Sequence, residues 1–269
     1  MKEAKNQFIL MDTPEFSKWL NTQDIRRSIK RIQNHHTWKP GYAHFKNNNH
    51  FKLLESMKRS HLKRRFSDIA QNITTFPDGT IAICRPLNKV PAGIRGANRG
   101  GICIEHIGNF DIGGDTMTVE HQNTIVWLNA VLCQKFKLRP DTDSIVYHHW
   151  WTSKGKRTNG VKPAKSCPGT NFFGGNSVEA AEQNFIPKII NQLENFDSQF
   201  SADSSGQMVD NNFPIPYAKS STVPHGDILQ NYLNQFSGIA LKVDGWPGEK
   251  TSNAFKQVMG YYLKGDPRN

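Results

Sequence analysis

The chain of 269 residues is 36% hydrophobic, with 16 Phe and 6 Trp, and this composition argues against global disorder. It has no run of eighteen apolar residues, which argues against a transmembrane helix. Its four cysteines have no CxxC spacing, so a disulfide framework is not expected. The formal charge of +11 is unevenly distributed, because residues 196–269 hold 6 Lys and Arg against 7 Asp and Glu, which leaves +12 for residues 1–195. This basic region suggests an anionic partner such as nucleic acid, an acidic membrane surface or a cell-wall polymer.

The N-terminus contains only a four-residue apolar stretch before Asp12 and Pro14, too short for the hydrophobic region of a secretory signal. We therefore expect synthesis in the cytoplasm without a recognisable export signal. A short helix is predicted next, with Thr13 as its N-cap and Pro14 at its first position. Phe16, Trp19 and Leu20 give this helix an apolar face.

Strand and helix patterns then alternate along the chain. Residues 28–36 are predicted to form a strand and residues 50–65 a helix, while residues 73–87 have the pattern of a hairpin that turns at Pro77-Asp78-Gly79. In the next predicted strand, "GICIEHIGNFD", Ile102, Ile104 and His106 share one face, and Cys103, Glu105 and Ile107 share the other.

The remaining elements complete a first domain. An amphipathic helix is predicted over 119–137, a strand over 144–151, and a last helix from Asn176 or Ser177 to about Phe196. Interleaved strands and helices predict an α/β domain at 1–196, with a central mixed sheet flanked by helices. Residues 197–225 are rich in Ser, Asp, Asn and Pro and are interpreted as a linker, and residues 226–269 as a small all-α domain.

Two histidine pairs and one cysteine have the chemistry of a metal site. His35-His36 and His148-His149 each lie at the end of a predicted strand, and Cys167 closes a lysine- and glycine-rich loop. A catalytic zinc site needs about three such ligands and one open position. We expect Cys84, Cys103 and Cys133 to be buried as small apolar residues instead. An isolated histidine is more often a surface or core residue, so the pattern favours a zinc site without establishing it.

Glu105 is a carboxylate within an apolar strand, where it requires a partner or a raised pKa. One interpretation is an edge strand with Glu105 facing solvent. The other is a general base that takes a proton from metal-activated water. Lys165, two residues before Cys167, would then lie near the metal and stabilise an oxyanion.

Five ordered motifs, "NHHTW", "DGT", "GICIEHIGNFD", "VYHHWW" and "KSCPGTNFF", resemble the zinc-dependent N-acetylmuramoyl-L-alanine amidases of the type 2 class, a family that includes animal peptidoglycan recognition proteins. The resemblance covers roughly Phe8 to Phe196. It implies zinc bound by His35, His148 and Cys167, with Glu105 and Lys165 as catalytic residues. The choice between His148 and His149 stays open, and so does the role of the loop 149–166, which is longer than expected for the family.

The resemblance implies hydrolysis of the amide between N-acetylmuramic acid and L-alanine in peptidoglycan. The lack of an export signal fits a phage lysin or an autolysin that acts on the wall after release, and it also fits a cytoplasmic recycling enzyme. Some family members have a tyrosine beside the metal, where this chain offers Gln71, which cannot act as an acid. The alternative function is a non-catalytic peptidoglycan-binding protein of the same fold. A nucleic-acid binder is disfavoured because charge alone supports it, and stable membrane insertion is not expected.

The C-terminal residues are similar to small helical peptidoglycan-binding repeats. The similarity rests on a pair of leucines, a Val-Asp-Gly turn and a Thr-x-x-Ala-Phe pattern, namely Leu229, Leu233, Val243, Asp244, Gly245, Gly248, Thr251, Ala254 and Phe255. It implies a module that tethers the enzyme to the wall. A packing module without ligand affinity is the alternative interpretation.

Overall fold

The computed structural model describes residues 2–203, 215–224, 226–234, 236, 238–259 and 262–268. The chain forms two compact units, Met1–Asp197 and Ser198–Asn269. None of the helices in the described residues is both long and apolar enough to cross a bilayer.

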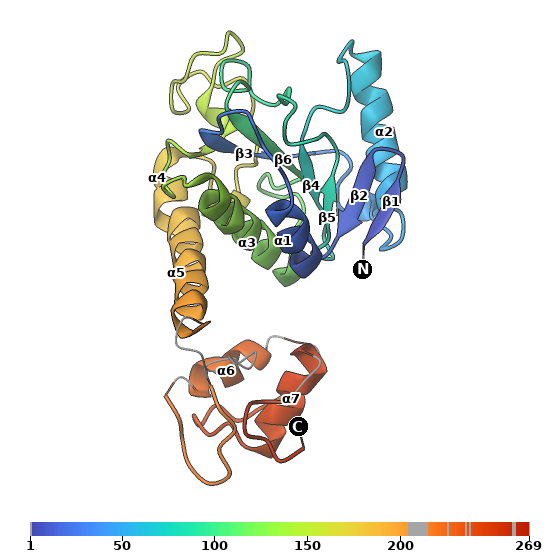
Figure 1. Ribbon diagram of the computed structural model, residues 1–269. Helices are drawn as coiled ribbons and strands as arrows, with labels where there is room; N and C mark the ends of the chain where they lie inside the picture. The colour runs from blue at the N-terminus through green and yellow to red at the C-terminus, as the bar shows by residue number, and fades with distance from the viewer. Residues whose placement is uncertain are drawn as a thin grey trace. The chain divides into compact units, whose positions relative to one another are not determined.

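The first unit is built on a mixed sheet of seven strands (Figure 1). Strand β3 pairs in parallel with β6 and β7, and β4 pairs in parallel with β6, whereas the other three pairings are antiparallel. The order across the sheet is β1 (Glu3–Lys5), β2 (Phe8–Met11), β5 (Ile81–Ile83), β4 (Ile73–Thr75), β6 (Gly101–His106), β3 (Arg31–His36) and β7 (Ile145–Tyr147). With helices on its flanks, this sheet confirms the expected α/β fold.

Five α-helices accompany the sheet: α1 (Thr13–Asn21), α2 (His50–Lys63), α3 (Val119–Phe136), α4 (Val178–Ala180) and α5 (Ile186–Asp203). Short 3₁₀ turns cover Tyr42–His44, His148–Trp150 and Phe172–Gly174, and a π-helical turn, Ala181–Phe185, joins α4 to α5. The hairpin predicted around Pro77-Asp78-Gly79 is confirmed as β4 and β5.

Helix and strand boundaries differ from the sequence predictions at several points, including the strand predicted over 28–36, which begins at Arg31. Helix α1 is capped by Asp12 rather than Thr13, because the Asp12 side chain accepts from the Glu15 backbone N–H at 2.9 Å and Glu15 reciprocates. The strand predicted over 144–151 ends at Tyr147, and His148–Trp150 form a 3₁₀ turn instead.

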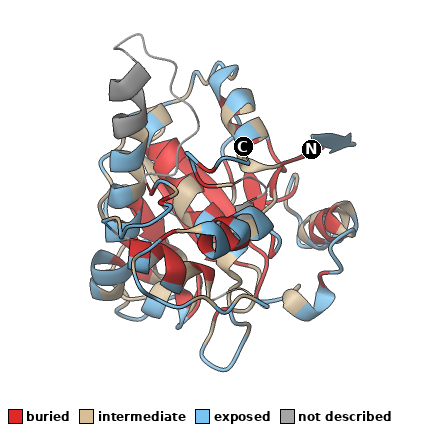
Figure 2. Ribbon diagram, turned by 90° about the horizontal axis from the view of Figure 1, so that it is seen from below, coloured by how far each residue is buried: buried red, intermediate tan, exposed pale blue. Residues whose placement is uncertain are grey.

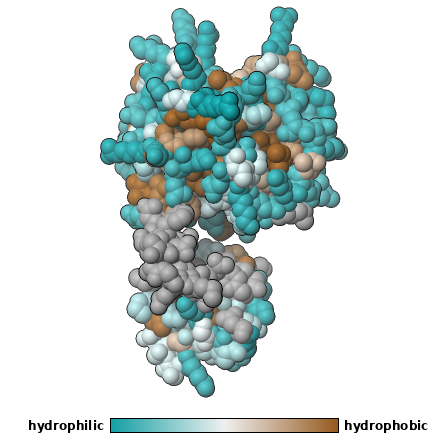
Figure 3. Space-filling view, in the orientation of Figure 1, coloured by the Kyte–Doolittle hydropathy of each residue, from teal (hydrophilic) through white to brown (hydrophobic). Residues whose placement is uncertain are grey.

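The two faces of the sheet carry separate apolar clusters. Helices α1, α3 and α5 pack on the face that includes Ile32, Ile102 and Ile104. Helix α2 packs on the other face, against Leu10 and Ala82. Figure 2 shows the buried residues gathered in the strands and on the inner sides of the helices. Polar side chains cover most of the surface seen in Figure 3, with smaller apolar patches between them.

On the face of the sheet that α2 covers, one row of residues in register changes from apolar to polar across the strands. Leu10 lies opposite Ala82, Ala82 opposite Thr74, Thr74 opposite Glu105, and Glu105 opposite His35. Because neighbours in register point to the same face of a sheet, one row passes from the apolar cluster under α2 to a carboxylate and an imidazole. The fold thereby places Glu105 and His35 side by side.

The described part of the second unit contains α6 (Gly226–Leu233) and α7 (Glu249–Met259). Their apolar core consists of Ile215, Leu229, Leu233, Ala254, Phe255 and Leu263. The segment interpreted as a linker differs at both ends, because α5 continues to Asp203 and Ile215 is part of this core. Its residues 204–214 lie outside the described residues, so the extent of the linker and the all-α character of the small domain stay predictions.

A buried glutamine organises the turn between the two helices. Gln230 accepts from the backbone N–H groups of Asp244 and Gly245 at 2.9 and 2.8 Å. Its amide nitrogen donates to Asp244 Oδ1 at 2.8 Å and to the Trp246 carbonyl at 2.9 Å. Four hydrogen bonds from one side chain that is 2% exposed fix the Val-Asp-Gly turn on α6.

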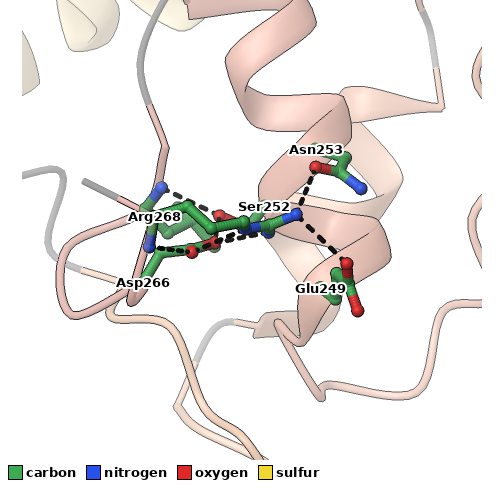
Figure 4. Close-up of polar contacts among 6 residues, drawn as sticks. Glu249, Ser252, Asn253, Asp266 and Arg268 are labelled. Atoms are coloured by element: carbon green, nitrogen blue, oxygen red, sulfur yellow. Dashed lines mark hydrogen bonds and ion pairs between the residues drawn. The ribbon is translucent and has the colours of Figure 1, made fainter.

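A second polar cluster ties the C-terminus to α7 (Figure 4). Arg268 donates to Asp266 at 2.7 Å, to Asn253 at 2.8 Å and to Glu249 at 3.2 Å. The Ser252 hydroxyl donates to the buried Asp266 carboxylate. Hydrogen bonds from Arg268 hold the pKa of Asp266 well below its usual value.

We expect Asp266→Ala to lower the free energy of unfolding of the second unit by about 1–3 kcal/mol, because Ser252 and Arg268 lose a charged partner. A carboxylate with a lowered pKa stabilises the fold above its unfolded-state pKa, about 3.9, and this stabilisation is lost as pH falls further. The wild-type unit should therefore weaken below about pH 4, and the variant should show a shallower dependence. Hydrogen exchange of α7 amides in the full chain measures both effects.

Glu249→Ala is the matched control. The Glu249 side chain is 71% exposed and also pairs with Arg268, so its loss should change stability by less than about 0.5 kcal/mol. Equal losses in the two variants would contradict the special role of the buried carboxylate.

Candidate metal centre

Three of the residues singled out in the sequence come together at one edge of the sheet. The candidate ligand atoms of His35, His148 and Cys167 all lie within 4.8 Å of one another. Cys167 Sγ is 3.4 Å from His35 Nδ1, and the two imidazole rings are 5.0 Å apart between centroids. In the described part of the chain, no other group of His, Cys, Asp and Glu side chains has this arrangement.

The parallel pairing of β3 with β7 explains why these histidines meet. Asn34 lies opposite Tyr147, so the residues that follow them, His35 and His148, leave neighbouring strands at the same edge. The backbone N–H of His149 donates to the Cys167 carbonyl at 2.7 Å, which holds the distant loop against this edge. The structure thus places His148, and not His149, beside His35 and Cys167.

The chemistry of this group fits zinc. Two imidazoles and a thiol are common zinc ligands, and three protein ligands leave one position open. Burial lowers the pKa of His35 well below its ordinary value and that of His148 to about 4, which favours the neutral rings that coordination requires. His35 Nε2 is buried without a hydrogen-bond partner among the described residues. Burial raises the pKa of the Cys167 thiol, and a metal ion bound by this group would lower it again.

Glu105 lies in an interior strand, since β6 runs between β4 and β3. The interpretation of an edge strand with a solvent-facing carboxylate is therefore wrong. The residue is half-buried and lines the same cavity as His35 and Cys167. Burial raises its pKa to about 8, against the opposing effect of the Lys165 charge. A carboxyl group in this environment is suited to accept and return a proton near neutral pH.

Lys165 is exposed and lines this cavity as well. Its positive charge adds to the effect of burial in lowering the pKa of His148. It also lowers the pKa of Cys167, where burial dominates in the opposite direction. The positive charge of Lys165 therefore affects the pKa of each of the other four candidate site residues, and it would attract an anion to the cavity.

The cavity has a volume of about 1350 Å³. Besides the residues above, one wall comes from α2, including His61, and from Arg64 directly after it, and another from the segment 92–98, including Arg95. Residues near both ends of the loop 149–166 form the rest of the cavity lining. A cavity of this size with convergent polar groups is large enough for an extended substrate.

Arg157 anchors the long loop 149–166, which could not be placed from the sequence. Its guanidinium lies 5.5 and 5.4 Å from the ring centroids of Trp150 and Trp151, and it forms a 2.6 Å ion pair with Asp143. The Ala164 backbone N–H donates to the Trp151 carbonyl at 2.9 Å. These contacts fold the loop back on itself, so that Lys165 reaches the cavity.

The other residues considered in the sequence analysis are buried or form hydrogen bonds to neighbouring segments. His36 is buried and its Nδ1 accepts from the Phe110 backbone N–H at 3.1 Å. His149 Nδ1 lies 2.9 Å from the Lys165 carbonyl. Gln71 is buried, donates to Thr74 at 2.9 Å and does not line the cavity. Cys84, Cys103 and Cys133 are buried, as expected.

The family model described as N-acetylmuramoyl-L-alanine amidase matches residues 25–170, which include all five candidate site residues. The chain therefore belongs to the N-acetylmuramoyl-L-alanine amidase family. No curated protein matches the sequence.

Solved structures of the same class are similar over about half of the chain or slightly more. The N-acetylmuramoyl-L-alanine amidase LysC from Clostridium intestinale is 23% identical, with 54% of this chain and 80% of that chain covered and a TM-score of 0.40. Drosophila PGRP-LB is 18% identical, with coverage of 60% and 83% and a TM-score of 0.45. Drosophila peptidoglycan recognition protein SA is 17% identical, with coverage of 63% and 90% and a TM-score of 0.46.

Proposed function

We propose that the first unit hydrolyses the amide bond between N-acetylmuramic acid and L-alanine in peptidoglycan, with zinc as its cofactor. The observation that carries this proposal is the meeting of His35, His148 and Cys167 beside Glu105 within the family's matched range. A ligand set with an open position and an adjacent general base is the arrangement that metal-assisted amide hydrolysis needs.

When bound, zinc supplies a Lewis acid and makes water a stronger nucleophile at neutral pH. Glu105 accepts the proton of the attacking water and donates one to the leaving amine. Lys165 stabilises the negative charge that develops on the former carbonyl oxygen. His36 and His149 hold the backbone near the site through their contacts with Phe110 and Lys165.

Peptidoglycan is the proposed partner of both units. The positive charge of residues 1–195 favours an anionic wall, and a C-terminal wall-binding module would raise the local concentration of the enzyme by tethering. We place the activity at the cell wall, after release of a protein made in the cytoplasm, as for a lysin or an autolysin.

Mass analysis of digested cell walls tests the proposal. We expect purified peptidoglycan treated with the zinc-loaded protein to yield free stem peptides with an L-alanine N-terminus and glycan strands without new reducing ends. A chelator should abolish this release because it removes the Lewis acid, and added zinc should restore it.

The alternative function, peptidoglycan recognition without catalysis, predicts a different outcome. Wall fragments would then bind to the protein but stay intact. Release of stem peptides that a chelator leaves unchanged would contradict the zinc mechanism instead.

A further inference from the structure

One wall of the cavity carries an exposed tryptophan that the proposed reaction does not use. Trp38 is 62% exposed and lies three residues after His35, just beyond the end of β3. Of the large hydrophobic residues exposed in the described ranges, only Trp38 also lines the cavity. Single exposed aromatic residues are common on protein surfaces, but one that lines a cavity with convergent polar groups is placed to contact a ligand there.

Hydrogen bonds to a neighbouring segment hold the backbone of Trp38 in a left-handed conformation. Its φ is +57°, a left-handed value that is unfavourable for a residue with a side chain. Its N–H donates to the Gly108 carbonyl at 2.9 Å. The Thr37 hydroxyl donates to the Pro40 carbonyl and accepts from the Gly108 N–H, at 2.5 and 2.9 Å.

These bonds fasten the turn to the segment that follows β6, the strand of Glu105. The indole therefore extends from a hydrogen-bonded turn into the cavity that the candidate metal ligands also line. Rigid aromatic side chains bind a ligand at a low cost in conformational entropy.

We propose that Trp38 is a stacking platform for the sugar ring of the substrate, an inference that rests on the proposed function. In the amide to be cleaved, a short lactyl ether joins the carbonyl carbon to the sugar, so the ring must lie close to the metal ligands. The C–H face of a pyranose is apolar and fits a flat indole face. The stem peptide carries carboxylates, which suit Arg64 and Arg95 on the other cavity walls.

Indole NMR signals of the ¹⁵N-labelled full chain test where the sugar binds. Titration with peptide-free glycan strands should shift the Trp38 Nε1–H signal, which Trp38→Phe identifies by its loss. The Trp19 signal should stay in place, since Trp19 does not line the cavity. Free stem peptide should leave the Trp38 signal unchanged. A shift with the peptide alone, or none with the glycan, would overturn the proposal.

Kinetics provide the second readout. Trp38→Ala should raise KM about tenfold for a substrate with the sugar, the size expected from one aromatic contact, with kcat little changed. Trp38→Phe should restore most of this loss. On a lactyl peptide without the sugar, wild type and Trp38→Ala should be equal, and an equal loss on both substrates would refute stacking.

Val90→Ala is the matched control, because Val90 is 46% exposed and does not line the cavity, and it should behave as wild type. The two proposals fail separately. A glycan-dependent shift of the Trp38 signal in a protein that cleaves no amide would refute hydrolysis and retain the sugar platform.

Discussion

Cys167→Ala is expected to abolish zinc binding and activity together. The variant removes the only sulfur ligand of the group and leaves two imidazoles at an otherwise three-residue site. Zinc content after dialysis should fall from about one equivalent to well below a tenth, and the rate of stem-peptide release should fall by at least about 100-fold. Metal analysis of the purified protein measures the first effect independently of the second.

The matched control is Cys133→Ala, which removes a buried thiol in α3 on the opposite face of the sheet. This variant should retain its zinc while losing some stability, because it leaves a small cavity in the core. If Cys167→Ala retained a full equivalent of zinc, or if both variants lost it equally, Cys167 would not be a ligand. Thermal unfolding with and without added zinc separates the two causes, since only a protein that binds the ion is stabilised by it.

Strand periodicity in the sequence was enough to predict the strands and the face of the sheet on which a site residue lies. Ile102 and Ile104 in β6 face one apolar cluster, and this alternation sends Glu105 to the other face, as the sequence predicted. The pairing of β6 with β3 was not readable from either strand alone, because register depends on contacts between residues about seventy positions apart. That pairing decides that Glu105 lies beside His35 in the interior of the sheet.

Boundaries and loops were less predictable, for local reasons. Asp12 and Thr13 are both good N-caps, and the choice depends on the reciprocal bonds with Glu15. The aromatic run after Tyr147 favours a strand by propensity, but the His149 backbone bonds to Cys167 and the chain turns. The structural roles of Arg157 and Gln230 were missed, since each is defined by partners that the chain brings together only on folding.

The resemblance to amidases identified the three candidate ligands, but only the structure distinguishes His148 from His149 as the second ligand. His35 and His148 follow paired residues of β3 and β7 at the same edge of the sheet, whereas the next residue in the 3₁₀ turn, His149, contacts the Lys165 carbonyl. The geometry therefore supports one histidine of each pair as a candidate ligand.

Glu105→Gln is expected to retain zinc and to lose activity. The amide matches the carboxylate in size and keeps a hydrogen-bonding group in the half-buried position, so the fold and the three candidate ligands should be preserved. It cannot accept a proton, and removal of a general base typically costs about 10²–10⁴ in rate. The loss should appear in kcat rather than in KM, because proton transfer takes place in the transition state.

Glu120→Gln provides the comparison, since Glu120 is exposed at the start of α3 and does not line the cavity. It should retain both zinc and the wild-type rate. A Glu105→Gln variant that hydrolysed peptidoglycan at nearly the wild-type rate would assign the proton transfer to another group. A variant that lost its zinc would instead show that the carboxylate supports the metal, because the loss of activity would then follow from the empty site. Measuring zinc content and kcat on the same preparation therefore decides between a proton-transfer role and a metal-supporting role for this half-buried carboxylate.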